Sequence, residues 1–494
     1  MLLILLTIFV GGLIYAVLPE KTPPGRTCMG VRTLSESEMT GLGSSRYRDY
    51  SENLKFQNEY AAIDEETSVI YIPQNIDGST RAETLEGLLM IDAPGQELFF
   101  APDVYWEDLS EAVRIGHKFK LLVSGWQNTY MQYDVVFTTL PVISMHGQLL
   151  YKDSEGRDVF SGRIVLWEPE EAKTTSTCVH WHIRGKSAGG QEKKPWKLSL
   201  KNWDGKNSRE NLLGLGSDDD WILNAMNMED SNVREKLFMD LWNEMVQQTD
   251  YNHSMSQGEY TEVLVNGEYT GLYLLQRRVD DRYLQLDQGQ TLVKGLWNGT
   301  ELGYEYISPV PADERMVERI DAFFFQDEVQ ILSIDNFIDT NLFLQFFCAN
   351  DNRSYKNMYY LFSDREGGSV SFIPWDTDMA FGIQWDPLTD GFVYRYEENV
   401  NGFVERQEMN TMIQYYPDMK ARLDARWKEL REHIFSQSHI YDQLNEYLAV
   451  LDASGAPERD REKWGLYFEG EDRIDILYQF IEERLAVLDQ YYSE

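Results

Sequence analysis

The sequence predicts an α+β fold, in which short strands occupy the first part of the chain and helices occupy the end. Strand-like runs separated by turn residues continue as far as Leu275, and Asn266-Gly267 is a strong signal for a hairpin turn. Beyond Tyr415, apolar residues instead recur at helical spacing. The chain has 494 residues, of which 43% are hydrophobic. This composition allows large packed cores and excludes a disordered chain.

The first residues predict a membrane anchor or signal segment at 1–20. Leu2 to Leu18 are apolar or small, close to the roughly 17–25 residues that a membrane span needs. Basic residues follow this run and none precedes it, a pattern that by itself favours a body on the inner side. Since no small-x-small cleavage site follows, we expect an uncleaved anchor. We expect an extracytoplasmic body at the cell surface, with its sidedness left open.

Three further segments are expected after the anchor. Residues 21–45 are polar and contain Gly and Ser, as in a linker. Residues 46–139 predict a small β-rich accessory module, with strands expected around Ser68–Pro73 and Lys118–Val123. Residues 140–494 form the remaining domain, which holds every candidate functional residue.

The second domain is predicted to begin with strands and to become helical. Strands are expected at Val179–Arg184, Pro195–Leu200 and, as a hairpin, Tyr260–Leu275. A helix is expected over Asp230–Met245, and another over Asp335–Cys348. The C-terminal helices carry apolar stripes such as the one formed by Ile474, Leu477, Ile481 and Leu485.

The net charge of −37 limits the classes of partner. A strongly negative surface repels phosphates, so a nucleic-acid binder is not expected. Basic proteins and divalent cations are the favoured partners. The three cysteines are too few for a disulfide framework, and their spacing fits no zinc motif.

The most informative segment contains two acidic loops separated by a hairpin. Asp351 and Asn357 come before the predicted hairpin, and Asp376 and Asp378 follow it. A hairpin that folds back would bring the two loops close together. Carboxylate and amide oxygens suit Mg²⁺, and phosphoryl transfer uses an Asp base together with an Asn and an Asp on the metal. The alternative is two Asp-capped turns that are merely solvated.

A glycine-rich loop between two strands adds a candidate phosphate cradle. Arg184, Gly185 and Ser187 lie in this loop, whose backbone N–H groups could meet phosphate. In the following strand, Lys197 alternates with apolar neighbours and could reach the phosphates. Lys193 and Lys194 are alternative candidates for this role. The simpler interpretation of Lys197 is a solvated surface lysine.

Two other polar groups are assigned no role. His180 and His182 share one strand face, but no third metal ligand lies nearby in the sequence. The run Asp218–Asp220 is expected to be an exposed turn.

These motifs resemble the CotH family, the spore-coat protein H kinases, from about Leu140 to the C-terminus. The resemblance rests on several segments that occur in the same order. They are Ile183-Arg-Gly-Lys-Ser187, Lys193-Lys-Pro-Trp-Lys-Leu198, Asp220-Trp221, Asp230-Ser-Asn-Val-Arg234, Val265-Asn-Gly-Glu-Tyr-Thr-Gly-Leu-Tyr273, Lys356-Asn357 and Ile373-Pro-Trp-Asp-Thr-Asp378.

The resemblance implies a divergent protein-kinase-like domain with a helical C-terminal lobe. It implies ATP and Mg²⁺, with Mn²⁺ as an alternative ion, as cosubstrates, and Ser or Thr of basic, Ser-rich coat or surface proteins as acceptors. Asp351 would be the catalytic base and Asp376 the main metal ligand, with Asn357 and Asp378 completing the metal shell. Lys197 would meet the phosphates, together with the loop of Arg184, Gly185 and Ser187.

Three departures from the family pattern leave rival functions open. Arg277 stands where the family usually has Glu, the interval from Asp351 to Asn357 is about one residue longer than in the family pattern, and the loop reads Arg-Gly-Lys-Ser-Ala where the family more commonly has Arg-Gly-Asn-Ser-Ser. The Arg277 departure favours an inactive pseudokinase that acts as a scaffold. A metal-dependent hydrolase built on the same acids is a second rival.

Overall fold

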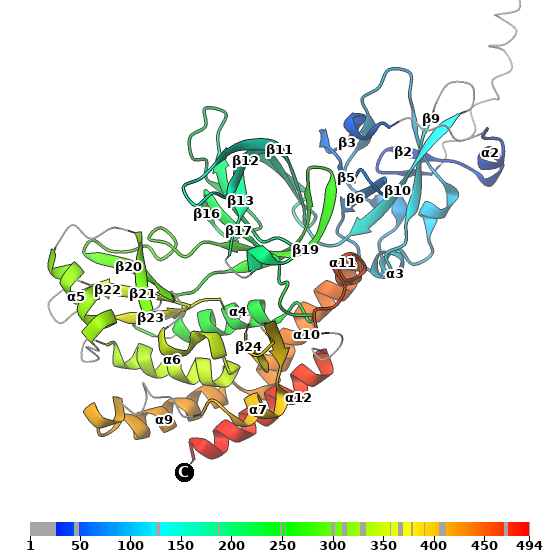
Figure 1. The fold of residues 1–494 in the computed structure, drawn as a ribbon. Coiled ribbons are helices and arrows are strands. Elements are labelled where there is room, and N and C mark those ends of the chain that lie inside the picture. Colours follow the sequence, from blue (N-terminus) through cyan, green and yellow to red (C-terminus); the bar gives the residue numbers. More distant parts are fainter. Residues whose placement is uncertain are drawn as a thin grey trace, which may run out of the picture. The chain divides into compact units, whose positions relative to one another are not determined.

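The computed structural model describes most of the chain beyond residue 25. The chain divides into two compact units. The first unit contains the described residues up to Thr139 together with Pro169–Lys173, and the second contains Leu140–Glu168 and the rest of the chain from Thr174. Both units are shown in Figure 1. The described ranges are 26–43, 49–124, 129–185, 188–247, 249–251, 253–297, 302–308, 314–326, 332–355, 357–363, 369–376, 379–389, 391–404, 412–468 and 473–493. The predicted mixture of strands and helices is confirmed.

The first unit is built on a seven-stranded sheet and a three-stranded sheet. The strands expected near residues 68–73 and 118–123 are both present, and they belong to the larger sheet. That sheet has the order β1 (Thr27–Cys28), β2 (Val31–Thr33), β8 (Leu98–Phe100), β9 (Phe119–Ser124), β10 (Tyr130–Thr138), β6 (Val69–Pro73), β5 (Ala62–Asp64). The smaller sheet has the order β4 (Glu59–Tyr60), β3 (Leu54–Phe56), β7 (Leu89–Ile91), and the helices are α2 (Glu36–Thr40) and α3 (Leu109–Arg114).

The second unit begins with a closed barrel. In order around the barrel, its strands are β11 (Val142–Lys152), β12 (Asp158–Glu168), β13 (Lys173–Ile183), β14 (Trp196–Lys201), β17 (Asp220–Asn224), β19 (Glu268–Arg277) and β18 (Gly258–Val265). Large side chains such as Trp181, Leu198 and Trp221 fill the interior. Because side chains alternate along a strand, Lys197 and Ser199 lie on the opposite face of β14, as the sequence predicts.

The remainder of the second unit combines a four-stranded sheet with helices (Figure 1). The sheet has the order β21 (Leu302–Ser308), β20 (Gln290–Trp297), β22 (Met358–Ser363), β23 (Ser371–Pro374). The predicted helical segments are helices, and their apolar faces form one large core with α6 at its centre. The helices are α4 (Arg234–Gln247), α5 (Glu314–Gln326), α6 (Ile334–Phe347), α7 (Tyr396–Asn401), α9 (Met419–Glu432), α10 (Gln437–Ser454), α11 (Ala456–Trp464) and α12 (Ile474–Tyr491).

Helix α11 joins the helical part to the barrel, because it packs along β19 (Figure 1). Arg459 makes two bonds to the fully buried carboxylate of Glu262, from Nε at 2.9 Å and from Nη2 at 2.7 Å. Asp460 accepts the backbone N–H of Leu272 at 2.9 Å and pairs with the buried ammonium of Lys193 at 2.9 Å. These buried contacts hold the barrel against the helices that carry the candidate catalytic loop.

The predicted anchor at 1–20 lies outside the described residues. Within the ranges given above, no helix combines the length and the apolar character that crossing a membrane requires.

Candidate functional site

The two acidic loops meet at one end of the β22–β23 hairpin. These strands are antiparallel and pair Met358 with Pro374, so the segments before and after the hairpin lie side by side. The buried Asn352 side chain donates to the carbonyl of Asn357 at 2.9 Å and to that of Trp375 at 2.8 Å. The predicted approach of the two loops is therefore present, and Asn352 fastens them together.

Asp351 and Asn357 are in direct contact. Asp351 lies in η7 (Asn350–Tyr355), a short 3-10 helix that follows α6, and its carboxylate accepts a hydrogen bond from the Asn357 side-chain amide. This 3-10 helix accommodates the long interval between the two residues. Since the Asn357 nitrogen donates to Asp351, its side-chain oxygen is the atom left to face a cation.

Asp376 is exposed at the start of the second loop. Asn357 and Asp376 both have a left-handed backbone, with φ of 52° and 60°. Asn and Asp tolerate this conformation better than most residues, which explains why they occupy the two turns. Asp378 and Ser187 lie outside the described residues. Among the residues that are described, no three His, Cys, Asp or Glu side chains are grouped closely enough to hold a metal ion.

The oxygen donors that are present nevertheless fit Mg²⁺ chemically. Asp376 supplies an exposed carboxylate, and the side-chain oxygen of Asn357, whose nitrogen donates to Asp351, is of the type that serves as a neutral ligand. A magnesium ion needs only one or two protein oxygens when phosphate and water supply the rest. The residues can therefore take part in such a site without forming a complete protein cage.

Basic side chains from three distant segments lie near Asp376. Arg184, at the end of β13, places its guanidinium 5.7 Å from the centre of the Trp375 ring. Lys294 on β20 lies 5.9 Å from the ring of Tyr359, its partner on β22. Burial lowers the pKa of Lys294, and Arg184 and Arg278 lower it further, whereas Asp376 opposes the shift.

Lys197 lies next to the same basic group and is paired with Asp220. The Lys197 ammonium is 3.3 Å from Asp220 Oδ2, and the Arg278 guanidinium is 3.0 Å from the same oxygen. Burial lowers the pKa of Lys197, and Asp220 opposes this shift. We call Arg184, Lys197, Arg278 and Lys294 the cation group.

The two rival lysines are engaged elsewhere. Lys193 is buried, where it binds Asp460 and the carbonyl of Leu272. Lys194 donates to the carbonyl of Gly189 at 3.1 Å and so bonds to the glycine-rich loop itself. Gly185 in that loop has φ of 77°, a conformation that L side chains rarely adopt.

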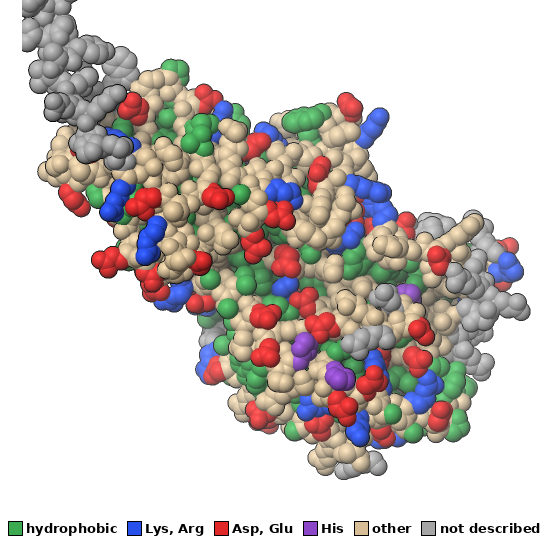
Figure 2. All heavy atoms as spheres, turned by 180° about the vertical axis from the view of Figure 1, so that it is seen from behind, with side chains coloured by type: hydrophobic (Ala, Val, Ile, Leu, Met, Phe, Trp, Pro, Cys, Tyr) green, Lys and Arg blue, Asp and Glu red, His purple; other side chains and the backbone are tan. Residues whose placement is uncertain are grey.

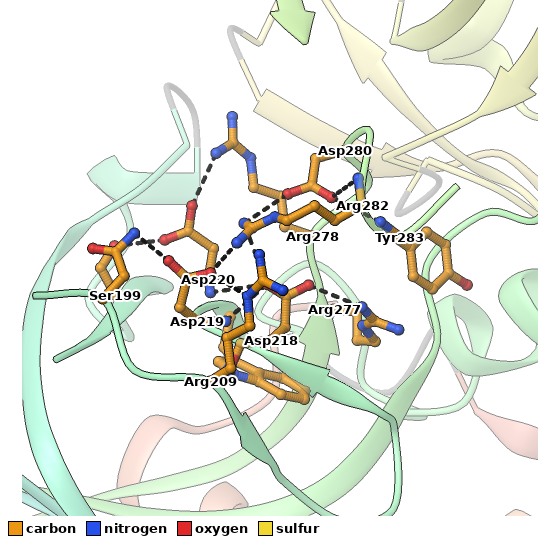
Figure 3. Close-up of polar contacts among 12 residues, drawn as sticks. Ser199, Arg209, Asp218, Asp219, Asp220, Arg277, Arg278, Asp280, Arg282 and Tyr283 are labelled. Atoms are coloured by element: carbon orange, nitrogen blue, oxygen red, sulfur yellow. Dashed lines mark hydrogen bonds and ion pairs between the residues drawn. The ribbon is translucent and has the colours of Figure 1, made fainter. Parts of the chain in front are cut away.

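Arg277 does not extend toward the cation group. Its guanidinium lies 2.9 Å from the buried Asp218 carboxylate and 4.7 Å from the centre of the Tyr283 ring. Figure 3 shows Arg277 and Arg278 pointing to opposite sides. The residue that departs from the family pattern is therefore held by Asp218, the acid that directly precedes Asp219 and strand β17.

The prediction that Asp218–Asp220 is an exposed turn is wrong. Asp218 and Asp219 are each only 1% exposed, and Asp220 begins strand β17. Each of the three acids binds an arginine at the end of β19 or in the segment that follows it (Figure 3). An isolated acidic triplet resembles a solvated turn because its arginine partners lie about sixty residues away in the sequence.

A comparison with protein-family models identifies the chain. The model for the CotH kinase protein matches residues 181–488, more than half of the chain. The chain belongs to the CotH family. In this CotH chain the match begins within β13, ends within α12 and contains every candidate site residue. A search of curated proteins finds no match.

Sequence reasoning missed Lys294, Arg278 and Asn352. Lys294 lies on a strand whose pairing with β22 cannot be read from the local sequence. The sequence pattern drew attention to Arg277, which departs from the family, and assigned no role to the neighbouring Arg278. The signal that could have found Lys294 is a basic residue within the otherwise apolar run of β20.

If the chain binds Mg-ATP, as the family resemblance implies, we expect Lys294→Gln to weaken that binding about tenfold, because a hydrogen bond from a charged group is worth roughly 1.5–3 kcal/mol. Isothermal titration calorimetry measures the affinity. Lys428→Gln, at an exposed position on α9, is the matched control. Equal affinity of the Lys294 variant and the control would show that Lys294 does not meet the nucleotide.

Proposed function

We propose that this CotH chain transfers the γ-phosphoryl group of ATP to Ser or Thr hydroxyls of basic, Ser-rich proteins. The observation that carries the proposal is the cation group. In a protein of net charge −37, Arg184, Arg278 and Lys294 lie around Asp376, and Lys197 adjoins them through Arg278. The Asp220 carboxylate offsets part of this positive charge, and a polyphosphate is a ligand that would neutralise the rest.

The residues divide into three roles. Lys197, Arg278, Lys294 and Arg184 bind and orient the triphosphate. Asp351 takes the proton of the acceptor hydroxyl while a P–O bond forms to that oxygen and the P–O bond to ADP breaks. Asp376, Asn357 and Asp378 would hold Mg²⁺, or Mn²⁺, whose contribution is to neutralise charge on the phosphates.

The nature of the acceptor follows from the surface charge. Figure 2 shows acidic side chains spread over the face that it displays. A negative surface steers positively charged partners toward it, an effect that weakens as salt rises. We propose a membrane-anchored protein at the cell surface, attached through residues 1–20. Membrane fractionation of the full chain and of a variant without these residues tests this attachment.

The direct experiment is incubation of the protein with labelled ATP, Mg²⁺ and a Ser/Lys-rich peptide. We expect label on the peptide with wild type and none with Asp376→Ala. Melting temperature with and without Mg-ATP separates the alternatives, because a ligand bound only by the folded state raises it. Stabilisation without transfer would indicate a pseudokinase, and release of free phosphate without labelled peptide would indicate a hydrolase. If wild-type protein shows neither stabilisation by Mg-ATP nor release or transfer of phosphate, ATP is not its ligand and the proposed function is wrong.

A further inference from the structure

The Asp220 carboxylate is bound by three side chains at once, of which Ser199 and Arg278 are labelled in Figure 3. Its Oδ1 accepts the Ser199 hydroxyl at 2.7 Å. Its Oδ2 lies 3.3 Å from the Lys197 ammonium and 3.0 Å from the Arg278 guanidinium. Ser199, Lys197 and Arg278 together lower the pKa of this carboxyl against the opposing effect of its burial.

The barrel places Asp220 between the two cations. Strand β17 pairs with β14 on one side and with β19 on the other. Ser199 is the direct cross-strand partner of Asp220, and Lys197 is two residues along the same face of β14. Arg278 comes directly after the last residue of β19. One carboxylate on the middle strand therefore reaches basic side chains from both neighbours.

Arg278 links this arrangement to the metal loop. Both Arg278 and Asp376 act electrostatically on Lys294 and on Tyr359. Lys197 in turn experiences the charge of Arg278. The position of Arg278 thus decides how far the cation group extends from β14 toward Asp376.

The neighbouring acids restrict the same segment. Asp218 binds Arg277 at 2.9 Å, and Arg282 makes an ion pair with Asp219 and one with Asp280, the latter at 3.0 Å. Since these arginines have carboxylates of their own, Asp220 is left to Arg278. The chain on both sides of Arg278 is therefore held against the segment that leads into β17.

We propose that Asp220 is a positioning residue of the phosphate site, which holds Lys197 and Arg278 side by side so that one polyphosphate meets both. This inference rests on the proposed function. Without the carboxylate, the two cations would repel each other, and each would lose a charged hydrogen-bond partner. Asp220 acts through these side chains and does not itself touch the reacting atoms.

The proposal has a pH signature. The charged and titratable groups that face Lys197 are Asp220, Arg278, Arg157 of the β11–β12 turn and His182, its cross-strand partner. Asp220 is the group that raises the pKa of Lys197, whereas Arg278 and Arg157 lower it. Removing the Asp220 charge therefore lowers that pKa further. Lys197 would lose its proton at a lower pH, and the alkaline loss of nucleotide affinity would move in the same direction.

The experiment compares Asp220→Asn with wild type from pH 6 to about pH 10. KM for Mg-ATP, kcat and the affinity for inorganic tripolyphosphate without Mg²⁺ are measured. We expect KM and the tripolyphosphate Kd to rise about ten- to a hundredfold, with a smaller change in kcat. The alkaline limb of the pH profile of nucleotide affinity should shift to lower pH. Asp220→Glu should restore much of the affinity, and Asp204→Asn, in an exposed turn after β14, is the matched control.

Two results would overturn the inference. One is an unchanged KM and tripolyphosphate affinity in Asp220→Asn. The other is a fall in kcat alone with the alkaline limb unmoved, as a merely structural role would give. If wild type binds tripolyphosphate but transfers no phosphoryl group, the proposed function fails, and the tripolyphosphate comparison still decides the role of Asp220. If wild type binds neither anion, both proposals fall.

Discussion

Asp351→Asn is expected to lower kcat for peptide phosphorylation by roughly 10²–10⁴-fold, the usual contribution of a positioned general base. Affinity for Mg-ATP should change only a few fold, because the cation group lies on other segments of the chain. Asp351 contacts Asn357, and an Asn at position 351 keeps the shape of the side chain but cannot accept the proton. Initial rates with labelled ATP measure kcat, and calorimetry measures nucleotide affinity.

Two comparisons make the Asp351 result interpretable. Asp442→Asn, at an exposed position on α10, should keep the wild-type rate. Asp376→Ala should instead lose both binding of Mg-ATP and transfer, because it removes an oxygen ligand. A rate for Asp351→Asn equal to that of the Asp442 control would show that another group accepts the proton, or that the transfer needs no base.

Arg459→Ala is expected to destabilise the second unit by about 3–5 kcal/mol, because it leaves a buried carboxylate without its cation. Glu262 is fully buried and is held by two bonds from Arg459 and one from the Tyr269 hydroxyl at 2.6 Å. The loss should lower the melting temperature by several degrees and speed hydrogen exchange along β18 and β19. Calorimetry and exchange mass spectrometry measure the two effects.

Helix α11 offers a matched control for this change. Arg461 pairs with Glu458 at 2.7 Å on the exposed side of the same helix, so Arg461→Ala should cost at most about 1 kcal/mol. The double variant Glu262→Leu/Arg459→Met should recover much of the loss, since no unpaired charge remains. Similar melting temperatures for Arg459→Ala and Arg461→Ala would contradict the assigned role of α11.

The approach of the loop of Asp351 and Asn357 to the loop of Asp376 could be predicted because it is a local event. A short hairpin joins their two loops, and antiparallel pairing returns the chain to its starting point. The outward position of Lys197 was equally accessible, because strand alternation with Trp196, Leu198 and Leu200 decides it. Both predictions needed only the alternation of side chains along one strand or the turn between two adjacent strands.

The partners of the charged residues could not be predicted in the same way. Asp218–Asp220 looks like a solvated turn until β17 and β19 are seen to pair, which places three arginines against three acids. Lys193 and Lys197 look equivalent as phosphate ligands until α11 is placed, because Asp460 then engages Lys193. In each case the deciding partner is distant in sequence.

The sequence by itself determined the CotH motifs, the alternation of strands and helices, and the hairpin that joins the two acidic loops. The tertiary structure alone decided which cations face Asp376, where Arg277 points and which acid holds Lys197. The physical reason is the distance along the chain over which each kind of interaction acts. Hydrogen bonding and side-chain period act between near neighbours in the chain, whereas charge acts through space between groups that only long-range strand pairing brings together.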